Sequence, residues 1–339
     1  MNRVIIKYLF SFVFYSLLFF LQNCRTKEKN IDPDCPMFDL VPQSPYDDPV
    51  WHPSGDFIGF NHKPIKEIKY TYGFDCPRQA SYIYENDSIG FWLINKDGSN
   101  KRRVLPYKLQ MPAWSPDGKW IAFGAGAQIF KMPFDGAQFD TAAIEQLTFE
   151  GRNFFPAWSP DGLWIAYDNT NCGSATTPIP PNSCGILTMK PDGSNKRFIN
   201  GPARIPYWSN NKYSVYSYGT KYDLATGSSD IFFDPIKNNI AFGYPVRFNP
   251  SSTLITFIGH YTNTPTQFQK LFSITPEGNN LKAISNKNIM NFSWSPEGKI
   301  VYLNYDYNRI DEGKGALWIM DADGTNQRQL TFNYFIISN

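Results

Sequence analysis

The stretch Trp114-Ser115-Pro116-Asp117-Gly118-Lys119-Trp120-Ile121-Ala122-Phe123 decides the fold, because it recurs along the chain. One near copy begins at Trp158 (Trp-Ser-Pro-Asp-Gly-Leu-Trp-Ile-Ala-Tyr), and another begins at Trp294 (Trp-Ser-Pro-Glu-Gly-Lys-Ile-Val-Tyr). Shorter copies complete a set of six anchors, which are Trp51, Trp114, Trp158, Trp208, Phe248 and Trp294. Their separations of 63, 44, 50, 40 and 46 residues match the period of about 40–50 residues that β-propellers show, with one four-stranded blade per repeat.

A second pattern occurs once in each repeat, as an apolar run that ends in a turn. It is clear in Phe91–Gly98 (Phe-Trp-Leu-Ile-Asn-Lys-Asp-Gly) and in Leu317–Gly324 (Leu-Trp-Ile-Met-Asp-Ala-Asp-Gly), and Ile231–Phe233 is its degenerate member. Asp-Gly between apolar runs is a strong hairpin signal, because Gly takes positive φ without steric cost. We therefore expect this run to form the third strand of each blade.

The whole pattern predicts an all-β fold, a six-bladed β-propeller of four-stranded antiparallel blades over residues 45–339. Aromatic residues make up 17% of the chain and charged residues only 18%, with 26 Pro and 24 Gly, which suits many short strands joined by tight turns. The long first spacing is explained by an insertion at Lys63–Asn86. Because a single blade leaves its faces and edges exposed, the ring is expected to close.

The first 23 residues have the features of a lipoprotein-type signal peptide. Arg3 and Lys7 precede an uncharged run of 14 residues, Tyr8–Leu21, which is shorter than the roughly 20 residues of a membrane-spanning helix. Cys24 follows in a lipobox-like setting, so we expect it to be acylated and residues 24–44 to form a lipidated tether and N-terminal arm. An ordinary secretion signal or an uncleaved anchor is the alternative.

The remaining four cysteines are an even number, as expected for disulfides in an oxidising compartment. Cys172 and Cys184 flank a Pro-rich insertion, and a bond between them would close it as a small loop. Cys35 would then pair with Cys76 and join the N-terminal arm to the first insertion. Four cysteines allow three pairings, of which we favour this one. A zinc site is the alternative, although no His-rich spacing supports it.

The charge balance argues against a nucleic-acid partner. The chain has 32 basic and 30 acidic residues. Removal of the first 23 residues takes away Arg3 and Lys7 and leaves 30 of each sign. A formally neutral mature protein has no net attraction to a phosphate backbone.

The repeated Trp-Ser-Pro-Asp-Gly followed by Ile-Ala-Phe resembles the TolB-type, WD40-like β-propeller repeat over roughly residues 45–332. The resemblance implies a propeller that binds another envelope protein, as TolB proteins bind a peptidoglycan-associated lipoprotein. This chain differs from that plan, because only about 20 residues separate Cys24 from the first blade and TolB proteins carry an α/β domain there. The resemblance therefore supports the fold more strongly than the function.

The sequence carries no recognisable catalytic motif. It has neither a Gly-x-Ser-x-Gly elbow nor a His-Glu-x-x-His pair, and its histidines are His52, His62 and His260. We expect no cofactor and no metal site, and an enzyme is the less favoured reading. The alternative is a carbohydrate-active propeller enzyme, a lyase or hydrolase, that uses the central channel as its cleft. The recurring Trp and Asp-Gly residues are expected to serve packing and turns rather than binding.

The expected binding site is the mouth of the central channel, where the innermost strands begin. The residues shortly before the anchors that we expect to line it are Asp47, Asp48, Met111, Asn153, Phe154, Arg204, Tyr244 and Asn291. A mixture of acidic, basic, amide and aromatic groups suits a peptide or protein better than a metal ion. The alternative is that these groups satisfy one another and water. The prediction is thus a monomeric, lipid-anchored, non-catalytic envelope protein, on the periplasmic side or at the outer membrane, that binds a protein or peptide there.

Overall fold

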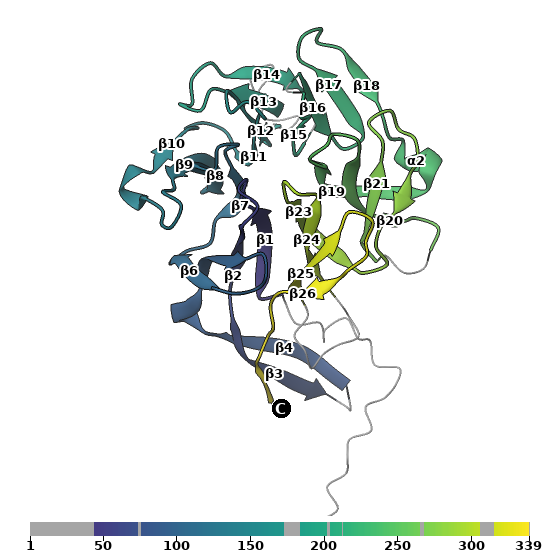
Figure 1. The fold of residues 1–339 in the computed structure, drawn as a ribbon. Helices are drawn as coiled ribbons and strands as arrows, with labels where there is room; N and C mark the ends of the chain where they lie inside the picture. The colour runs from purple at the N-terminus through teal and green to yellow at the C-terminus, as the bar shows by residue number, and fades with distance from the viewer. Residues whose placement is uncertain are drawn as a thin grey trace, which may run out of the picture.

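The computed structural model describes residues 44–338, apart from 74–75, 173–183, 202–203, 212, 265–267 and 306–314. For the rest of 70–80 and for 337, only the backbone is described. Six four-stranded antiparallel sheets follow one another around a central axis (Figure 1). The predicted all-β, six-bladed propeller is confirmed. The predicted signal segment 1–23, Cys24 and Cys35 lie outside the described residues.

In every blade, the innermost strand ends at the repeat anchor. These strands are β1 (Tyr46–Trp51), β7 (Gln110–Trp114), β11 (Asn153–Trp158), β15 (Tyr207–Trp208), β19 (Ile240–Phe248) and β23 (Ile289–Trp294). The second strands are β2 (Phe57–His62), β8 (Trp120–Ala125), β12 (Ile165–Asn169), β16 (Ser214–Ser217), β20 (Ile255–Tyr261) and β24 (Lys299–Asn304).

The third and fourth strands complete each blade toward the outside. The third strands are β5 (Gly90–Asn95), β9 (Gln128–Pro133), β13 (Gly185–Met189), β17 (Thr220–Asp223), β21 (Lys270–Ile274) and β25 (Ala316–Asp321). The fourth are β6 (Arg102–Leu105), β10 (Glu145–Gln146), β14 (Arg197–Asn200), β18 (Ser229–Ile231), β22 (Lys282–Ala283) and β26 (Arg328–Gln329). A four-residue helix, α2 (Pro235–Asn238), links the fourth and fifth blades.

One strand assignment from the sequence is wrong. We expected Ile231–Phe233 to belong to the third strand of the fourth blade, but the third strand is β17, and Ile231 ends the fourth strand, β18. The pattern was misleading because β17 is polar (Thr-Lys-Tyr-Asp) and turns through Gly227, without the Asp-Gly or Glu-Gly pair of the other blades.

The Ser-Pro-Asp-Gly segment forms a self-contained turn between the first two strands of a blade. Asp117 accepts hydrogen bonds from the Ser115 hydroxyl at 2.6 Å and from the Lys119 amide at 3.1 Å. Gly118 takes a positive φ of 70° there, which its missing side chain permits. The same bonds recur at Asp161, so the repeated aspartate serves the turn.

The anchor tryptophans join neighbouring blades. The indole Nε1 of Trp158 donates to the carbonyl of Ala113 at 3.2 Å, and that of Trp208 donates to the carbonyl of Ala157 at 2.9 Å. Trp294 donates to the Thr256 hydroxyl at 2.8 Å. Each bond reaches from one blade to the preceding one. The anchors therefore belong to the packing between blades, as expected.

The ring closes between the first and the last blade without exchange of a strand. A shared apolar cluster fills this junction, with Tyr46, Trp51, Ile58, Phe60 and Ile94 from the first blade and Val301, Leu303, Leu317, Ile319 and Leu330 from the last. The Trp51 amide donates to the Ser293 hydroxyl at 3.0 Å. Arg328 donates to the carbonyls of Lys96 and Asp97, each at 2.9 Å. Packing therefore provides most of the closure.

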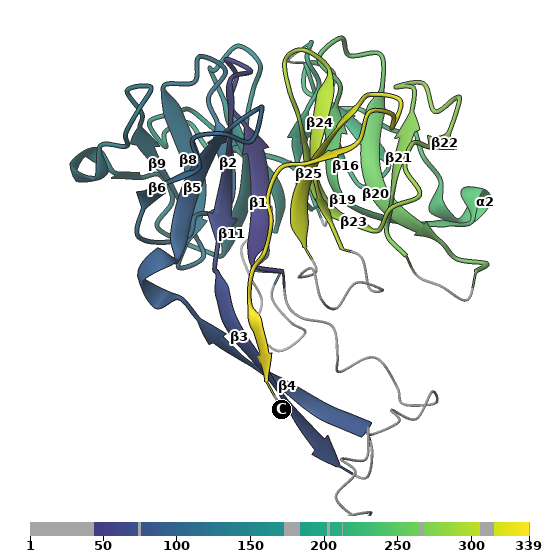
Figure 2. The same cartoon turned by 60° about the horizontal axis from the view of Figure 1, so that its bottom comes forward.

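The insertion near residues 63–86 forms a hairpin that projects from the propeller (Figure 2). Its strands are β3 (Ile65–Gly73) and β4 (Cys76–Tyr84). The chain returns after the last blade, and β27 (Ile336–Ser338) pairs with β3 in parallel. Phe335 packs with Ile65 and Ile68. The two ends of the ring are thus tied a second time, outside the blades.

The disulfide expected between Cys172 and Cys184 is present. Cys76 begins β4, but its side chain is not described, so its pairing with Cys35 stays a prediction. In the part of the chain that the structure describes, no helix has the length and hydrophobicity to span a bilayer.

The indole bonds give a stability prediction. Trp208→Phe removes the indole hydrogen bond to the Ala157 carbonyl, whereas Trp114→Phe removes an indole N–H that has no hydrogen-bond partner. We expect Trp208→Phe to lower the free energy of unfolding by about 1 kcal/mol more than Trp114→Phe. Denaturant unfolding of both variants measures the difference. Equal losses would show that the indole bond does not stabilise the junction.

Candidate functional site

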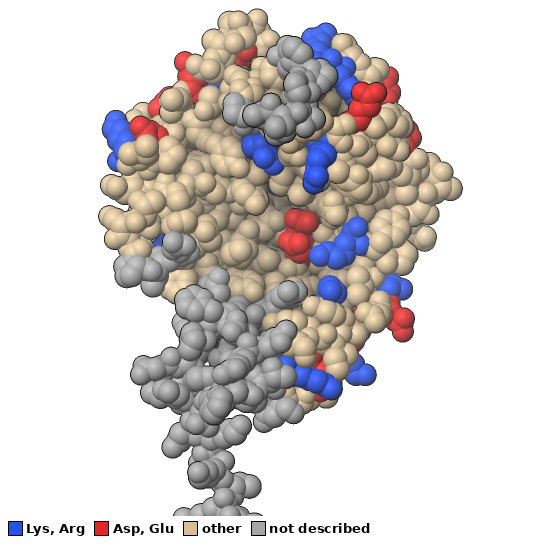
Figure 3. Space-filling model, turned by 180° about the vertical axis from the view of Figure 1, so that it is seen from behind, with Lys and Arg blue, Asp and Glu red and all other residues tan. Residues whose placement is uncertain are grey.

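A cavity of about 890 Å³ runs along the propeller axis. It is lined by the innermost strands of all six blades and by residues of the turns that follow them, among them Pro53 and Pro160. One end is the mouth where these strands begin. Figure 3 looks onto the face of the molecule behind that of Figure 1, where a few charged side chains near the centre stand in a broad uncharged surface.

One residue from each blade forms a ring at the mouth, which we call the mouth ring. Its members are Asp48, Met111, Phe155, Ile205, Tyr244 and Asn291. Five of the six directly precede a proline. Four of them, Asp48, Met111, Phe155 and Ile205, have positive φ values between 47° and 56°.

A bulge at this position turns the mouth ring toward the axis. In the first three blades, the pairing between the innermost and second strands shifts around the positive-φ residue, as between Asp47 and Val50. Side chains with a Cβ take positive φ at a cost of roughly 1–2 kcal/mol, so surrounding packing must hold them. Strained backbone of this kind is concentrated at functional sites.

A second ring, the inner ring, lies further along the innermost strands, two residues beyond the mouth ring in five blades and three residues beyond it in the fifth. Its members are Val50, Ala113, Ala157, Tyr207, Arg247 and Ser293. Side chains two apart on a strand share a face, which explains why both rings face the cavity. Four of the six side chains are small, whereas Tyr207 and Arg247 are large and adjacent. The cavity is therefore asymmetric at this level.

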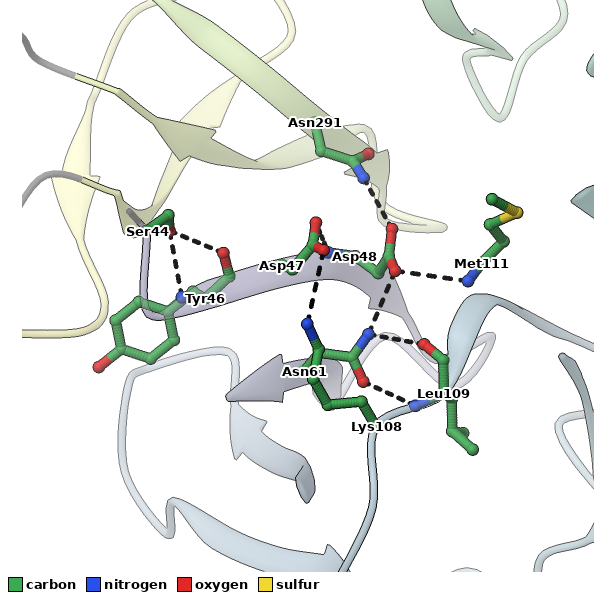
Figure 4. A network of polar contacts seen from close by, with 9 residues as sticks. All are labelled: Ser44, Tyr46, Asp47, Asp48, Asn61, Lys108, Leu109, Met111 and Asn291. Carbon is green, nitrogen blue, oxygen red and sulfur yellow. Dashed lines mark hydrogen bonds and ion pairs between the residues drawn. The ribbon is translucent and has the colours of Figure 1, made fainter. Parts of the chain in front are cut away.

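Asp48 is the centre of a polar network at the mouth (Figure 4). Its Oδ2 accepts hydrogen bonds from Asn61 Nδ2 at 3.1 Å and from the Met111 amide at 3.4 Å, and its Oδ1 accepts one from Asn291 Nδ2 at 3.2 Å. Asn61 also bonds both backbone groups of Leu109, donating to the carbonyl at 2.6 Å and accepting from the amide at 2.8 Å. The network joins the first, second and sixth blades.

The surroundings of Asp48 raise the pKa of its carboxyl group to a value near neutral pH. Burial and the neighbouring Asp47 raise the pKa of Asp48 from 3.8 to about 7, although the Met111 amide, Lys108 and Asn61 oppose the rise. The ammonium group of Lys108 lies 3.9 Å from the exposed Asp47 carboxylate. A carboxyl group with this pKa, open to a cavity, can change its charge within the physiological range.

The other side of the cavity is aromatic and cationic. The rings of Phe155 and Tyr244 meet edge to face, with centroids 5.9 Å apart. Below them, the guanidinium of Arg247 lies 4.9 Å from the centroid of the Tyr207 ring. Burial lowers the pKa of Arg247, while Tyr207 and Asp48 oppose this. The site thus presents amides and carboxyls on one side and aromatic groups with one cation on the other.

The structure brings together five of the eight residues proposed from the sequence. Asp47, Asp48, Met111, Tyr244 and Asn291 line the cavity.

The other three, Asn153, Phe154 and Arg204, are not among its lining residues. Asn153 is buried and donates to Gln128 and to the Glu150 carbonyl. Arg204 pairs instead with the buried Asp168 at 2.6 Å. Their places at the axis are taken by Phe155 and Ile205, which the sequence reasoning missed.

None of the three histidines lines the cavity. His52 stacks on Phe57, with ring centroids 4.3 Å apart, and His62 stacks on Tyr46 at 4.4 Å. His260 lies within hydrogen-bonding distance of Gln269, at 3.2 Å. Among the described residues, no group of three or more His, Cys, Asp or Glu side chains is arranged to hold a metal ion.

The raised pKa of Asp48 gives a pH prediction. Its pKa is higher in the folded protein than in the unfolded chain, so its contribution to stability is complete below pH 4 and is lost as the pH rises through about 7. Relative to Asp48→Asn, the wild type should lose stability over this range. Denaturant unfolding from pH 4 to pH 8 measures the difference.

Asp47→Asn is the matched control for this measurement. It removes the neighbouring charge that raises the pKa of Asp48, so it should move the loss of stability to lower pH. Parallel curves for the wild type and Asp48→Asn would contradict the assignment.

Comparison with known proteins supports the fold. Neither protein-family models nor curated proteins match the chain. Among solved structures, TolB from Acinetobacter baumannii matches with a TM-score of 0.55 and 16% identity, over 86% of this chain and 65% of that chain. An assigned TolB from Agrobacterium tumefaciens matches with a TM-score of 0.54 and 19% identity, over 69% and 84%. An oligogalacturonate lyase from Vibrio parahaemolyticus matches with a TM-score of 0.52 and 8% identity, over 89% and 83%.

These identities establish a shared architecture and not a shared activity. The chain spans about two thirds of the length of the Acinetobacter protein. It has the fold of a TolB-type six-bladed β-propeller.

Proposed function

We propose that this chain is a non-catalytic, lipid-anchored propeller of the bacterial cell envelope that binds a protein or peptide at the mouth of its channel. The observation that carries the proposal is the mouth ring, in which six blades present six different side chains around one cavity. A cavity with mixed polar and aromatic walls is the usual form of a specific binding site. The similarity of this chain to TolB structures agrees with a binding role.

The two ends of the propeller differ in a way that favours this mouth. The hairpin formed by β3 and β4 begins after His62, which pairs with Tyr46 at the start of β1. The connection that contains Cys172 begins after Asn169, which pairs with Asn153 at the start of β11. Both long connections therefore leave from the end that carries the mouth. Binding residues in propeller-like scaffolds are concentrated on such long connections.

The lipid anchor and the cellular compartment are proposed mainly from the sequence. Cys24 in its lipobox-like setting supports acylation, and the Cys172–Cys184 disulfide agrees with an oxidising compartment. The hairpin side of the molecule also carries the N-terminal end of β1, so a tether of residues 24–44 would leave from the same end as the mouth.

An enzyme is the second candidate. The likeness to an oligogalacturonate lyase structure favours a carbohydrate-active propeller that uses the channel as its cleft. Stoichiometric metal in the purified protein, with cleavage of an acidic oligosaccharide that a chelator abolishes, would support this alternative over the binding role.

The binding role is tested at the mouth. Met290, which lines the cavity and is 44% exposed, can be replaced without loss of core packing. Met290→Lys should reduce the partner recovered by crosslinking and pull-down from detergent-solubilised envelopes at least roughly tenfold, because it places a desolvated charge in the contact. Ile231→Lys, on the outer strand β18 and 76% exposed, is the matched control and should recover the wild-type amount.

Recovery of no partner by the wild-type chain after crosslinking would contradict the binding role. Equal recovery by both variants would move the contact away from the mouth.

The proposed lipid anchor at Cys24 is tested by a separate experiment. Cys24→Ala should abolish labelling with an alkyne fatty acid and release the protein from the membrane fraction, because a lipid chain supplies the membrane affinity. Asn23→Ala, which places a small residue before the cysteine, should keep the label. Labelling that survives in Cys24→Ala would rule out this cysteine as the site.

A further inference from the structure

A cation lies in the channel wall with most of its hydrogen-bonding capacity unused. Arg247 is partly buried on β19, and its Nη1 donates to the Val246 carbonyl at 3.0 Å. Its guanidinium also stacks on the Tyr207 ring. Within the described residues it forms no ion pair. A guanidinium has five N–H donors in a planar fork that matches the two oxygens of a carboxylate, and burial strengthens its need for such a partner.

Among the described residues, the channel offers Arg247 no ion-pair partner at this level. The rest of the inner ring is uncharged, and its members other than Tyr207 are Val50, Ala113, Ala157 and Ser293. Asp48 faces the same cavity, but it lies two positions nearer the mouth, where its oxygens already accept hydrogen bonds from Asn61, Asn291 and the Met111 amide. Arg247 is therefore available to an anion that enters from outside.

We propose that Arg247 binds the terminal carboxylate of a peptide whose C-terminal end enters the channel. The inference rests on the proposed binding role and names the part of the partner that the cavity receives. Arg247 lies between the mouth ring and the turn residues Pro53 and Pro160 at the other end of the cavity.

The shape of the cavity favours a chain end over an internal segment. A segment that doubled back would bring two strands through the mouth, and paired strands are about 4.8 Å apart before their side chains are counted. The edge-to-face contact of Phe155 with Tyr244 already occupies part of that opening. A chain end needs the width of one strand only. The volume of about 890 Å³ lies within the range of sites that enclose one small ligand, about 300–1,000 Å³.

The side chains of the cavity wall also indicate what kind of peptide end would fit. Ala113 and Ala157 leave space across the channel from Arg247 for the last side chain of the peptide, and the ring of Tyr207, next to Arg247, gives it an apolar surface. Nearer the mouth, the polar and aromatic side chains of the mouth ring would surround the preceding residues. The expected ligand is therefore a short C-terminal segment with an apolar last residue and a free carboxylate.

Two peptide libraries test the inference on the full chain in detergent. Both hold the same random heptapeptides, one set with free C-terminal carboxylates and the other with C-terminal amides. The wild type should retain the free acids roughly tenfold or more over the amides, as expected for loss of a charge-assisted hydrogen-bond pair. Arg247→Gln should abolish this preference while the protein keeps its thermal unfolding temperature.

Arg197→Gln is the matched control. The guanidinium of Arg197 also stacks on an aromatic ring, that of Trp164 at 4.9 Å, but it is exposed on the outer strand β14. This variant should keep the preference for free acids.

Three results would overturn the inference. Equal retention of both libraries that Met290→Lys abolishes would reject the carboxylate and leave the binding role at the mouth in place. Selection of internal Asp or Glu from both libraries, lost in Arg247→Gln, would show that the site reads side chains and not a chain end. Retention of neither library by the wild type would reject a peptide end as the ligand, and partner capture from envelopes would then decide the binding role by itself.

Discussion

The contact between neighbouring blades is the interaction on which the rest of this structure depends. A blade is a twisted sheet with apolar side chains on both faces, so it is stable only when another blade covers each face. The repeat encodes this requirement in one aromatic anchor per unit. Trp158, Trp208 and Trp294 each fill the junction and donate a hydrogen bond across it. Six such junctions fix the innermost strands around an axis, and the cavity is the space that they leave.

This arrangement separates the parts of the repeat that stabilise from the parts that can vary. The Ser-Pro-Asp-Gly turn satisfies its own hydrogen bonds, and the anchor packs between blades, so both stabilise the ring. The positions one and three residues before the anchor, or one and four in the fifth blade, face the cavity and belong neither to the turn nor to the anchor. They differ in every blade at the mouth, from Asp48 to Phe155 to Asn291. A regular scaffold thereby supports an irregular cavity wall.

The fold could be predicted closely from the sequence, and the site only in part, for a physical reason that single residues make clear. The anchors were visible because packing between blades tolerates little change, and every innermost strand ends at its anchor. The residues that face the axis depend on the register of the strand, and a bulge changes that register. Asn153, Phe154 and Arg204 were chosen by counting back from the anchor, but the positive φ at Phe155 and Ile205 turns those residues inward instead.

The sequence did carry a signal for Phe155 and Ile205, because a proline follows each of them and a proline follows the mouth-ring residue in five of the six blades. Arg247 was missed because nothing in the local sequence distinguishes a channel cation from a surface one.

The closure of the ring has a consequence for how the protein is made. The first blade cannot bury one of its apolar faces until the last blade has formed, because the face that carries Trp51 and Phe60 packs against residues near 301–330. A chain that is synthesised from its N-terminus therefore exposes this face until the last blade has been made. Such long-range contacts form slowly, and exposed sheets of this kind aggregate readily. The yield of folded protein is thus expected to depend on protection of this face during folding as well as on the stability of the finished ring.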